Sequence, residues 1–323
     1  MSRSELTRGG RAQYLLLRDV IPREAVEAGA ARIIAEMARG GWWAEGSDPS
    51  QRVARAGGPT PAGPDTSFAA TNPAMLRPHE ARAVTNDNDE VLRVLEAPEV
   101  YALLAQVFGE DAVTMDYKWF RAISPPLDGE VHGSFHVDKV YMGRGTPRLT
   151  TVWIPWHDIE PEDGGLAVLA GSSALPGFST LRDTYAEHDV SDTDIEAAAG
   201  GSYGSDPAEL LQLDPAARWL STVYRAGDVL LFGMKTLHGP LTSLRHAPRR
   251  TRLSTDTRWQ PASEPVDDRH TVGLGPDDEL WKRHGKYGLD WARDSKALNP
   301  HKGPWRTMEQ AKREWGLPEA PKL

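Results

Sequence analysis

The chain has 323 residues, a formal net charge of -9, no cysteine, 39% hydrophobic residues and 26% charged residues. This balance is ordinary for a globular enzyme, and the negative charge argues against nucleic acid or a membrane surface as the main partner. The missing cysteines exclude disulfides and thiol catalysis. With an N-terminus that lacks an apolar core, they favour a cytoplasmic location. No apolar run approaches the roughly 18 residues of a membrane-spanning helix.

The first third of the chain, 1–111, is predicted to be a helical elaboration of a single catalytic domain that spans 1–323. A short strand at 14–17 precedes a helix that begins near Pro22 and ends before Gly40. Residues 44–74 are rich in Gly, Pro, Ser and Asp and are predicted to form a long loop. A second helical stretch at 89–108 is predicted to break near Pro98.

From residue 112 to about 262 the pattern changes to short β-rich runs separated by turn residues, which is typical of a barrel or sandwich. The predicted strands are 113–123, 134–141, 148–156, 166–169, 229–232, 237–244 and 251–259. The sequence therefore favours a mainly β fold with flanking helices, of the α+β class.

The β-rich part is interrupted by a long insertion at 179–222, and the chain closes with a tail at 277–323. From Asp183 to Asp214 the insertion holds nine acidic residues and no Lys or Arg. Such a segment is either a solvated surface or a lid over a pocket, since long loops in compact domains often cover active sites. Helices are expected in the tail at 279–284 and 304–315.

The most specific motif is His136-Val137-Asp138, followed about a hundred residues later by His238. In a strand, side chains two apart share one face, so His136 and Asp138 can converge on one point. Of the ten histidines, only His136 has an acidic residue two positions later. Two imidazoles and one carboxylate suit Fe(II) and leave coordination positions open for a co-substrate and O2. The three residues are therefore predicted to be the metal ligands and the catalytic centre.

An oxygenase of this kind that uses 2-oxoglutarate also needs an anchor for the distal carboxylate of that co-substrate. A buried arginine suits this role because its planar fork matches a carboxylate and stays charged. Arg250, Arg252 and Ser254 share one face of the predicted strand that follows His238. Either arginine could point inward, and the sequence leaves the choice open.

The central 120 to 150 residues resemble the phytanoyl-CoA dioxygenase family of Fe(II)/2-oxoglutarate oxygenases. The matching pieces are His136-Val-Asp138, Trp153-Ile-Pro-Trp156, Glu162-Asp-Gly-Gly-Leu166, Ala170-Gly-Ser-Ser173, Gly227-Asp-Val-Leu-Leu-Phe232, His238-Gly239 and Arg250-Thr-Arg-Leu-Ser254. The resemblance implies a double-stranded β-helix, which is a jelly-roll core of the cupin type.

The resemblance also implies roles for individual residues. The family's metal ligands fall on His136, Asp138 and His238. Its 2-oxoglutarate arginine falls on Arg250, four residues before Ser254, with Arg252 as the second candidate. A tryptophan that contacts the co-substrate falls on Trp153, and Lys118 and Phe120 fall loosely where the family lines its pocket. Related halogenases lack the carboxylate ligand, so Asp138 argues against halogenation.

The expected reaction is hydroxylation of an unactivated C–H bond in a small metabolite, with release of succinate and CO2. Desaturation, cyclisation or epimerisation would use the same iron-centred oxidation, and the sequence does not separate them. A cupin-type metal enzyme that does not use 2-oxoglutarate and a silent β-helix binding protein are the alternatives. The substrate and the oligomeric state are not predicted.

Several further side chains are weaker candidates for the site. His132 could approach the metal or lie in the preceding loop, whereas His157 and His246 are expected at the surface or behind the ligands. Arg258 and Trp259, near the end of the last predicted strand, could face the substrate.

Overall fold

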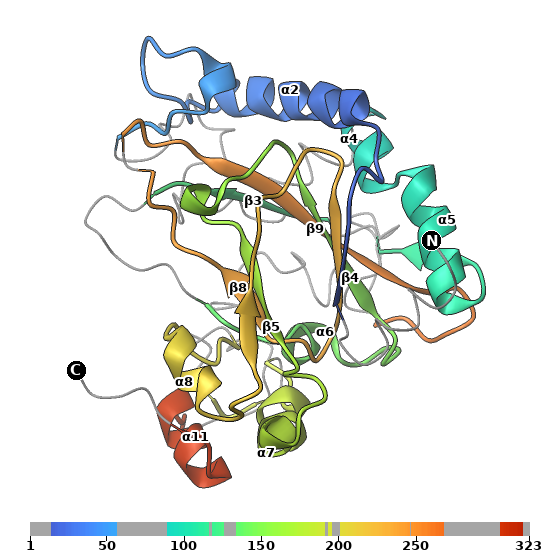
Figure 1. The fold of residues 1–323 in the computed structure, drawn as a ribbon, viewed down its shortest axis with the longest axis vertical. Coiled ribbons are helices and arrows are strands. Elements are labelled where there is room, and N and C mark those ends of the chain that lie inside the picture. The colour runs from blue at the N-terminus through green and yellow to red at the C-terminus, as the bar shows by residue number, and fades with distance from the viewer. Residues whose placement is uncertain are drawn as a thin grey trace.

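The structure is a computed structural model, shown in Figure 1. It describes residues 14–56, 89–115, 118–125, 134–190, 193–195, 201–245, 247–267 and 304–318. The predicted helix at 279–284, the histidines His132 and His246, and residues 57–74 of the predicted long loop lie outside the described residues.

Two antiparallel sheets form the centre of the fold. In the larger sheet the strand order is β1-β7-β4-β9-β2, and β3 also pairs with β9; the smaller sheet has the order β6-β5-β8. The strands are β1 (Tyr14–Leu17), β2 (Ala112–Thr114), β3 (Trp119–Ile123), β4 (Thr150–Pro155), β5 (Leu166–Ala170), β6 (Arg218–Leu220), β7 (Val229–Gly233), β8 (His238–Pro240) and β9 (Arg252–Pro261). This is a mainly β fold with flanking helices and a double-stranded β-helix core, as the sequence predicted.

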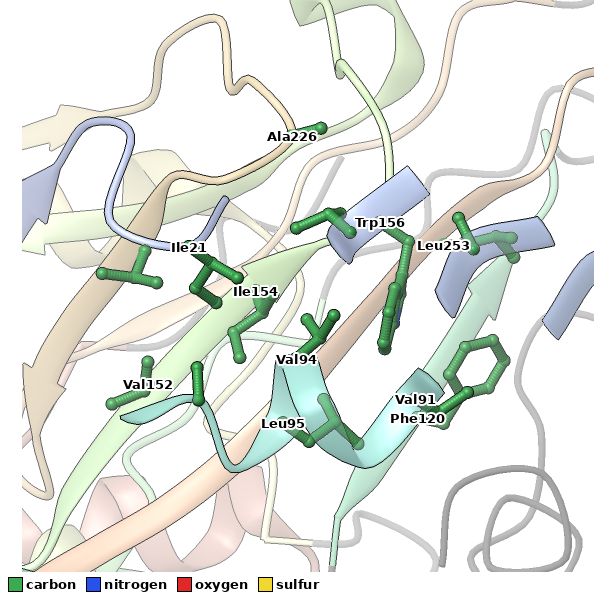
Figure 2. Close-up of a cluster of buried hydrophobic side chains, with 14 of the residues drawn as sticks. Ile21, Val91, Val94, Leu95, Phe120, Val152, Ile154, Trp156, Ala226 and Leu253 are labelled. Atoms are coloured by element: carbon green, nitrogen blue, oxygen red, sulfur yellow. The ribbon is translucent and has the colours of Figure 1, made fainter. Parts of the chain in front are cut away.

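Helices cover the outer face of the larger sheet. They are α2 (Arg23–Arg39), α4 (Asp89–Leu95) and α5 (Pro98–Phe108), and a short 3-10 turn, η1 (Pro49–Gln51), follows α2. Their apolar stripes meet the side chains of β4, β7 and β9 that point away from the smaller sheet, and Figure 2 shows part of this cluster. The break between α4 and α5 at Pro98 is confirmed, because proline stands at the first turn of α5.

The other face of the larger sheet is turned toward the smaller sheet. Trp153 of β4 and Leu230 and Phe232 of β7 pack there against Leu166 and Val168 of β5. The alternation of side chains along each strand therefore separates a helix-covered core from an inner compartment between the sheets.

The predicted insertion 179–222 is built into this end of the fold. It contains α7 (Ser179–Asp183), a 3-10 turn η5 (Tyr185–Glu187), α8 (Pro207–Leu211) and strand β6, which pairs with β5. With helix α11 (Met308–Trp315) these elements gather at the end of the molecule opposite α2 (Figure 1). The described part of the insertion is thus packed: Tyr185, Tyr203 and Leu210 are buried in one apolar cluster with residues of α11.

The predicted strand at 134–141 is wrong. Phe135 and His136 form only isolated bridges, and Asp138 has helical dihedrals (φ -63°, ψ -25°) at the start of α6 (Lys139–Met142). The predicted strand 113–123 is divided into β2 and β3, and the predicted strand 237–244 is only three residues long. No described helix is long and apolar enough to cross a membrane.

Candidate metal centre

His136, Asp138 and His238 converge in the compartment between the sheets. One ligand atom from each residue lies within 4.8 Å of the other two, and all three residues are buried. The Nε2 atoms of His136 and His238 each lie 3.7 Å from Oδ1 of Asp138. His136 reaches this position because its backbone pairs with that of His238, which opens β8.

The two imidazoles are held in matching orientations. Nδ1 of His136 lies 2.9 Å from the carbonyl oxygen of Ser134, and Nδ1 of His238 lies 3.0 Å from that of Thr236. If each Nδ1 carries the proton and donates it to its carbonyl, each Nε2 is left with a lone pair directed at the common point. Burial, together with the neighbouring His136, lowers the pKa of His238 to about 4, so this imidazole is neutral at physiological pH.

Asp138 is the anionic member of the group, and two side chains from the larger sheet contact it. Oδ2 accepts a short hydrogen bond from the hydroxyl of Thr151, and Oδ1 lies 3.3 Å from Nη2 of Arg258. Burial raises the pKa of Asp138, but the charge of Arg258, with smaller contributions from the neighbouring His238 and His136, outweighs it and holds the pKa well below its usual range. Asp138 is therefore a carboxylate at neutral pH.

Strand β9 supplies most of the polar wall of the compartment. Its residues alternate: Leu253 and Trp259 belong to the helix-covered core, whereas Arg252, Ser254, Asp256 and Arg258 point inward. All four inward side chains are buried. Such a row of buried charges is costly unless the groups are paired or bind ligands.

Arg252 is one of the two buried arginines of this row, the other being Arg258. Arg252 is 1% exposed, its Nη1 donates to Ser254 Oγ over 2.8 Å, and its guanidinium carbon lies 5.8 Å from the ring centroid of Trp153. Its Nε and Nη2, and the indole nitrogen of Trp153, have no hydrogen-bond partner among the described residues. Burial lowers the pKa of Arg252 to about 10, which leaves the guanidinium charged at neutral pH.

Arg250 and Lys118, two of the predicted co-substrate residues, lie in other surroundings. Arg250 is exposed and its backbone bridges to Val53. Lys118 is buried, but its ammonium donates to the carbonyl of Met115 over 2.7 Å and forms an ion pair with Glu96, the residue after α4. The structure therefore brings Arg252, Ser254 and Trp153 together and gives Lys118 a partner on the helical side.

The weaker candidates divide in the same way. Arg258 faces the centre, whereas Trp259 packs edge-on against Tyr101 of α5, with ring centroids 4.7 Å apart. His157 lies behind β9, where its Nε2 accepts a hydrogen bond from the backbone N–H of Leu253. Phe120, the other loosely matched pocket residue, is buried in the helix-covered core.

Thr151 was not among the residues predicted from the sequence to belong to the site. The signal was present, because Thr151 stands two residues before Trp153 on β4 and so shares its inward face. The contact of Arg258 with Asp138 could not be read from spacing alone, because it joins residues 120 positions apart.

The donor set fits a borderline divalent ion. Two neutral imidazoles and one carboxylate are the ligands of non-haem Fe(II) oxygenases, and the set occupies one side of the ion. Because a double-stranded β-helix carries this donor set between its two sheets, the protein falls in the class of mononuclear non-haem iron enzymes.

A comparison with protein-family models agrees with this class. The model of the family described as "Phytanoyl-CoA dioxygenase (PhyH)" matches residues 13–251. The chain belongs to the phytanoyl-CoA dioxygenase family, and it is an Fe(II)/2-oxoglutarate-dependent oxygenase.

Solved structures share the fold at low sequence identity. The α-ketoglutarate-dependent carbocyclase SnoK from nogalamycin biosynthesis superposes with a TM-score of 0.55 at 13% identity, over 88% of this chain and 91% of that chain. The epimerase SnoN, in complex with Fe3+, α-ketoglutarate and nogalamycin RO, gives 0.51 at 17% identity, over 82% and 87%. EctD from S. alaskensis, with 2-oxoglutarate and 5-hydroxyectoine, gives 0.51 at 15% identity, over 87% and 82%.

Proposed function

We propose that His136, Asp138 and His238 hold Fe(II), that Arg252 anchors 2-oxoglutarate, and that the enzyme hydroxylates an unactivated C–H bond of a small metabolite. The observation that carries this proposal is the convergence of three buried donor atoms beside a buried, partly unpaired guanidinium. When bound, iron would activate O2 while 2-oxoglutarate is converted to succinate and CO2.

We assign the 2-oxoglutarate anchor to Arg252 rather than to Arg250 because Arg252 is buried and Arg250 is exposed. A guanidinium with two free donors in a buried site matches a carboxylate in bidentate geometry. Ser254 fixes the third donor, and the face of Trp153 limits the rotation of the fork. The charged group of Arg250 lies in solvent, where it would bind a carboxylate only weakly.

The residues around the three ligands hold the ligand side chains in the orientation that metal binding requires. Thr151 holds one oxygen of Asp138, which leaves Oδ1 directed toward both imidazoles. Phe232 lies against His238, with ring centroids 4.3 Å apart, and limits the movement of that ring. We also propose that 1–323 is one catalytic domain in which the insertion 179–222 serves mainly as packed support, because its described part is buried against α11.

The first test is spectroscopic and needs no substrate. Fe(II) and 2-oxoglutarate added under anaerobic conditions should give a visible charge-transfer band, because the co-substrate chelates the metal. His136→Ala and Asp138→Ala should abolish the band, whereas Arg93→Gln, which removes a charge from the exposed pair of Arg93 with Glu99, should retain it. A band of full intensity in both ligand variants would show that the metal is bound elsewhere.

The second test identifies the reaction. Fractionated small metabolites are screened for succinate release, and the products formed under 18O2 are weighed. Hydroxylation places one heavy oxygen in the product, whereas desaturation or cyclisation removes two hydrogens and epimerisation leaves the composition unchanged. Turnover without 2-oxoglutarate would contradict the proposal.

A further inference from the structure

Arg258 occupies an unusual position for a cation, because it contacts the same carboxylate oxygen that faces both imidazoles. Its Nη2 lies 3.3 Å from Oδ1 of Asp138, and each imidazole Nε2 lies 3.7 Å from that atom. Arg258 is 3% exposed. A metal ion that binds the three ligands would therefore share its carboxylate oxygen with a buried positive charge.

Arg258 has few other counter-charges among the described residues. Nη2 lies 4.0 Å from Asp256, but Asp256 accepts a hydrogen bond of 2.8 Å from Nε of Arg121. Nε of Arg258 contacts the sulfur of Met142 at 3.2 Å, which supplies no charge. Asp138 is thus the closest anion to Arg258, and a dication at the same oxygen weakens that pairing.

One donor of Arg258 remains unused. Nη1 is buried and has no hydrogen-bond partner among the described residues. Because the guanidinium is planar, Nη1 belongs to the same rigid fork as Nη2, the atom that contacts Asp138. A buried donor of this kind is unfavourable until an acceptor reaches it.

We propose that Arg258 is a positioning residue that makes metal binding depend on an anionic ligand at the same centre. Without the anion, Arg258 competes with the metal for Asp138 and lowers the affinity of the metal. With a carboxylate ligand bound at the metal, the guanidinium gains a second anion and its free donor gains an acceptor. Metal and anion then strengthen each other, and the coupling is reciprocal.

This inference rests on the proposed function, since it assumes that His136, Asp138 and His238 bind a metal. It also predicts whether the affinity for the metal rises or falls when the guanidinium is removed, which the ligand set alone does not predict. A variant without the guanidinium should bind the metal more tightly when no anion is present, although a residue beside the site has been removed. A residue with a merely structural role would weaken metal binding in both conditions.

The experiment measures the dissociation constant of Mn(II) by calorimetry, with and without saturating 2-oxoglutarate, under anaerobic conditions. The ratio of the two constants is the coupling factor. Arg258→Gln should bind Mn(II) about tenfold more tightly than wild type without 2-oxoglutarate, and its coupling factor should be about tenfold smaller. Chelation by 2-oxoglutarate is common to all variants and cancels when their coupling factors are compared.

Two variants make the result unambiguous. Arg258→Met removes the charge with a side chain suited to the neighbouring cluster of Met115, Met142 and Met234, so it gives a second reading if the glutamine variant fails to fold. Arg93→Gln removes one positive charge from the α4 surface and should keep the wild-type coupling factor.

The outcomes separate the two proposals. A coupling factor within twofold of wild type in the Arg258 variants overturns the role of Arg258 and leaves the metal centre intact. Failure of wild type to bind Mn(II) at all, with or without 2-oxoglutarate, overturns the proposed metal centre and this inference with it.

Discussion

Arg250 and Arg252 are two residues apart, yet only Arg252 is buried beside Trp153. Replacing Arg252 with Gln should raise the dissociation constant of 2-oxoglutarate roughly 10- to 100-fold, because charge-assisted hydrogen bonds contribute about 1.5 to 3 kcal/mol. Arg250→Gln is the matched control and should change the constant less than about threefold. Titration of the anaerobic charge-transfer band measures both, and a larger loss in Arg250→Gln would return the anchor to that residue.

His157 gives the fold a dependence on pH. Its Nε2 accepts from the N–H of Leu253, its Nδ1 lies 2.6 Å from the carbonyl oxygen of Asp158, and burial beside Arg52 lowers its pKa to about 3. The unfolded chain, with a histidine pKa of about 6.5, binds the proton first as the pH falls. This residue therefore stabilises the fold above about pH 6.5, and its contribution is lost as the pH falls toward 3.

The free energy of unfolding shows this effect when urea titrations are run at pH 7 and pH 5. Wild type should lose about 2 kcal/mol more between these pH values than His157→Gln, which cannot be protonated. The variant keeps an acceptor for Leu253 N–H, so the two proteins should be comparable at pH 7, and wild type should be the less stable of the two at pH 5. Equal losses in both proteins would mean that His157 is not protected from the proton in the fold.

At the scale of elements, helix α11 is joined to α8 by a buried ion pair. Nζ of Lys312 lies 2.7 Å from Glu209 and 4.1 Å from the ring centroid of Tyr203, and neither charged side chain is more than 1% exposed. The backbone of Tyr203 bonds to Phe135, the residue before His136. The C-terminal helix is in this way connected to the metal-binding segment.

Lys312→Met should destabilise the fold by about 3 to 5 kcal/mol, because it leaves Glu209 buried without its cation. Adding Glu209→Gln should recover a large part of that loss, since the remaining charge is then removed. Urea unfolding of the two variants and wild type measures the difference, and Arg313→Met on the exposed face of α11 is the control. A double variant as unstable as the single one would show that packing, rather than charge, decides the cost.

The local sequence pattern predicted most helices and strands because the spacing of apolar residues in each segment matches the helix or strand that the segment forms. The period of two along β9 predicted that Arg252 and Ser254 share a face. The same rule failed at 134–141, where tertiary contacts decide: Thr151 and Arg258 hold the side chain of Asp138, and the backbone turns into α6. The ligands converge all the same, because His136 pairs with His238 across the compartment.

For the whole molecule, the sequence could predict the ligand types and the reaction class, but not which arginine is buried. Burial of Arg252 depends on the packing of Trp153 of β4 and of Tyr224, which lies in the segment between β6 and β7, and their relative positions are fixed only in the assembled fold. The contacts of Asp138 with Thr151 and Arg258 could not be predicted from the sequence for the same reason. Motif spacing identifies candidate ligands, whereas the contacts that orient their side chains are made between residues far apart in the sequence.

A metal at the centre should also stabilise the whole molecule, because its ligands connect the two sheets. His238 belongs to the smaller sheet, and Asp138 is bound to Thr151 and Arg258 of the larger one. A ligand present at 100 times its dissociation constant adds about 2.7 kcal/mol to the free energy of unfolding. Mn(II) with 2-oxoglutarate should therefore raise the Tm of wild type by several degrees, and scanning calorimetry measures the shift.

Asp138→Ala should abolish that shift and should also lower the stability of the metal-free protein, because Arg258 is left buried without its nearest anion. The expected cost is about 3 kcal/mol. The double variant Asp138→Ala/Arg258→Met removes both charges and should regain much of the metal-free stability without regaining the response to metal. Loss of the metal response would then be separated from loss of the fold. If Asp138→Ala kept the wild-type shift in Tm, the metal that stabilises the protein would have to bind outside this centre.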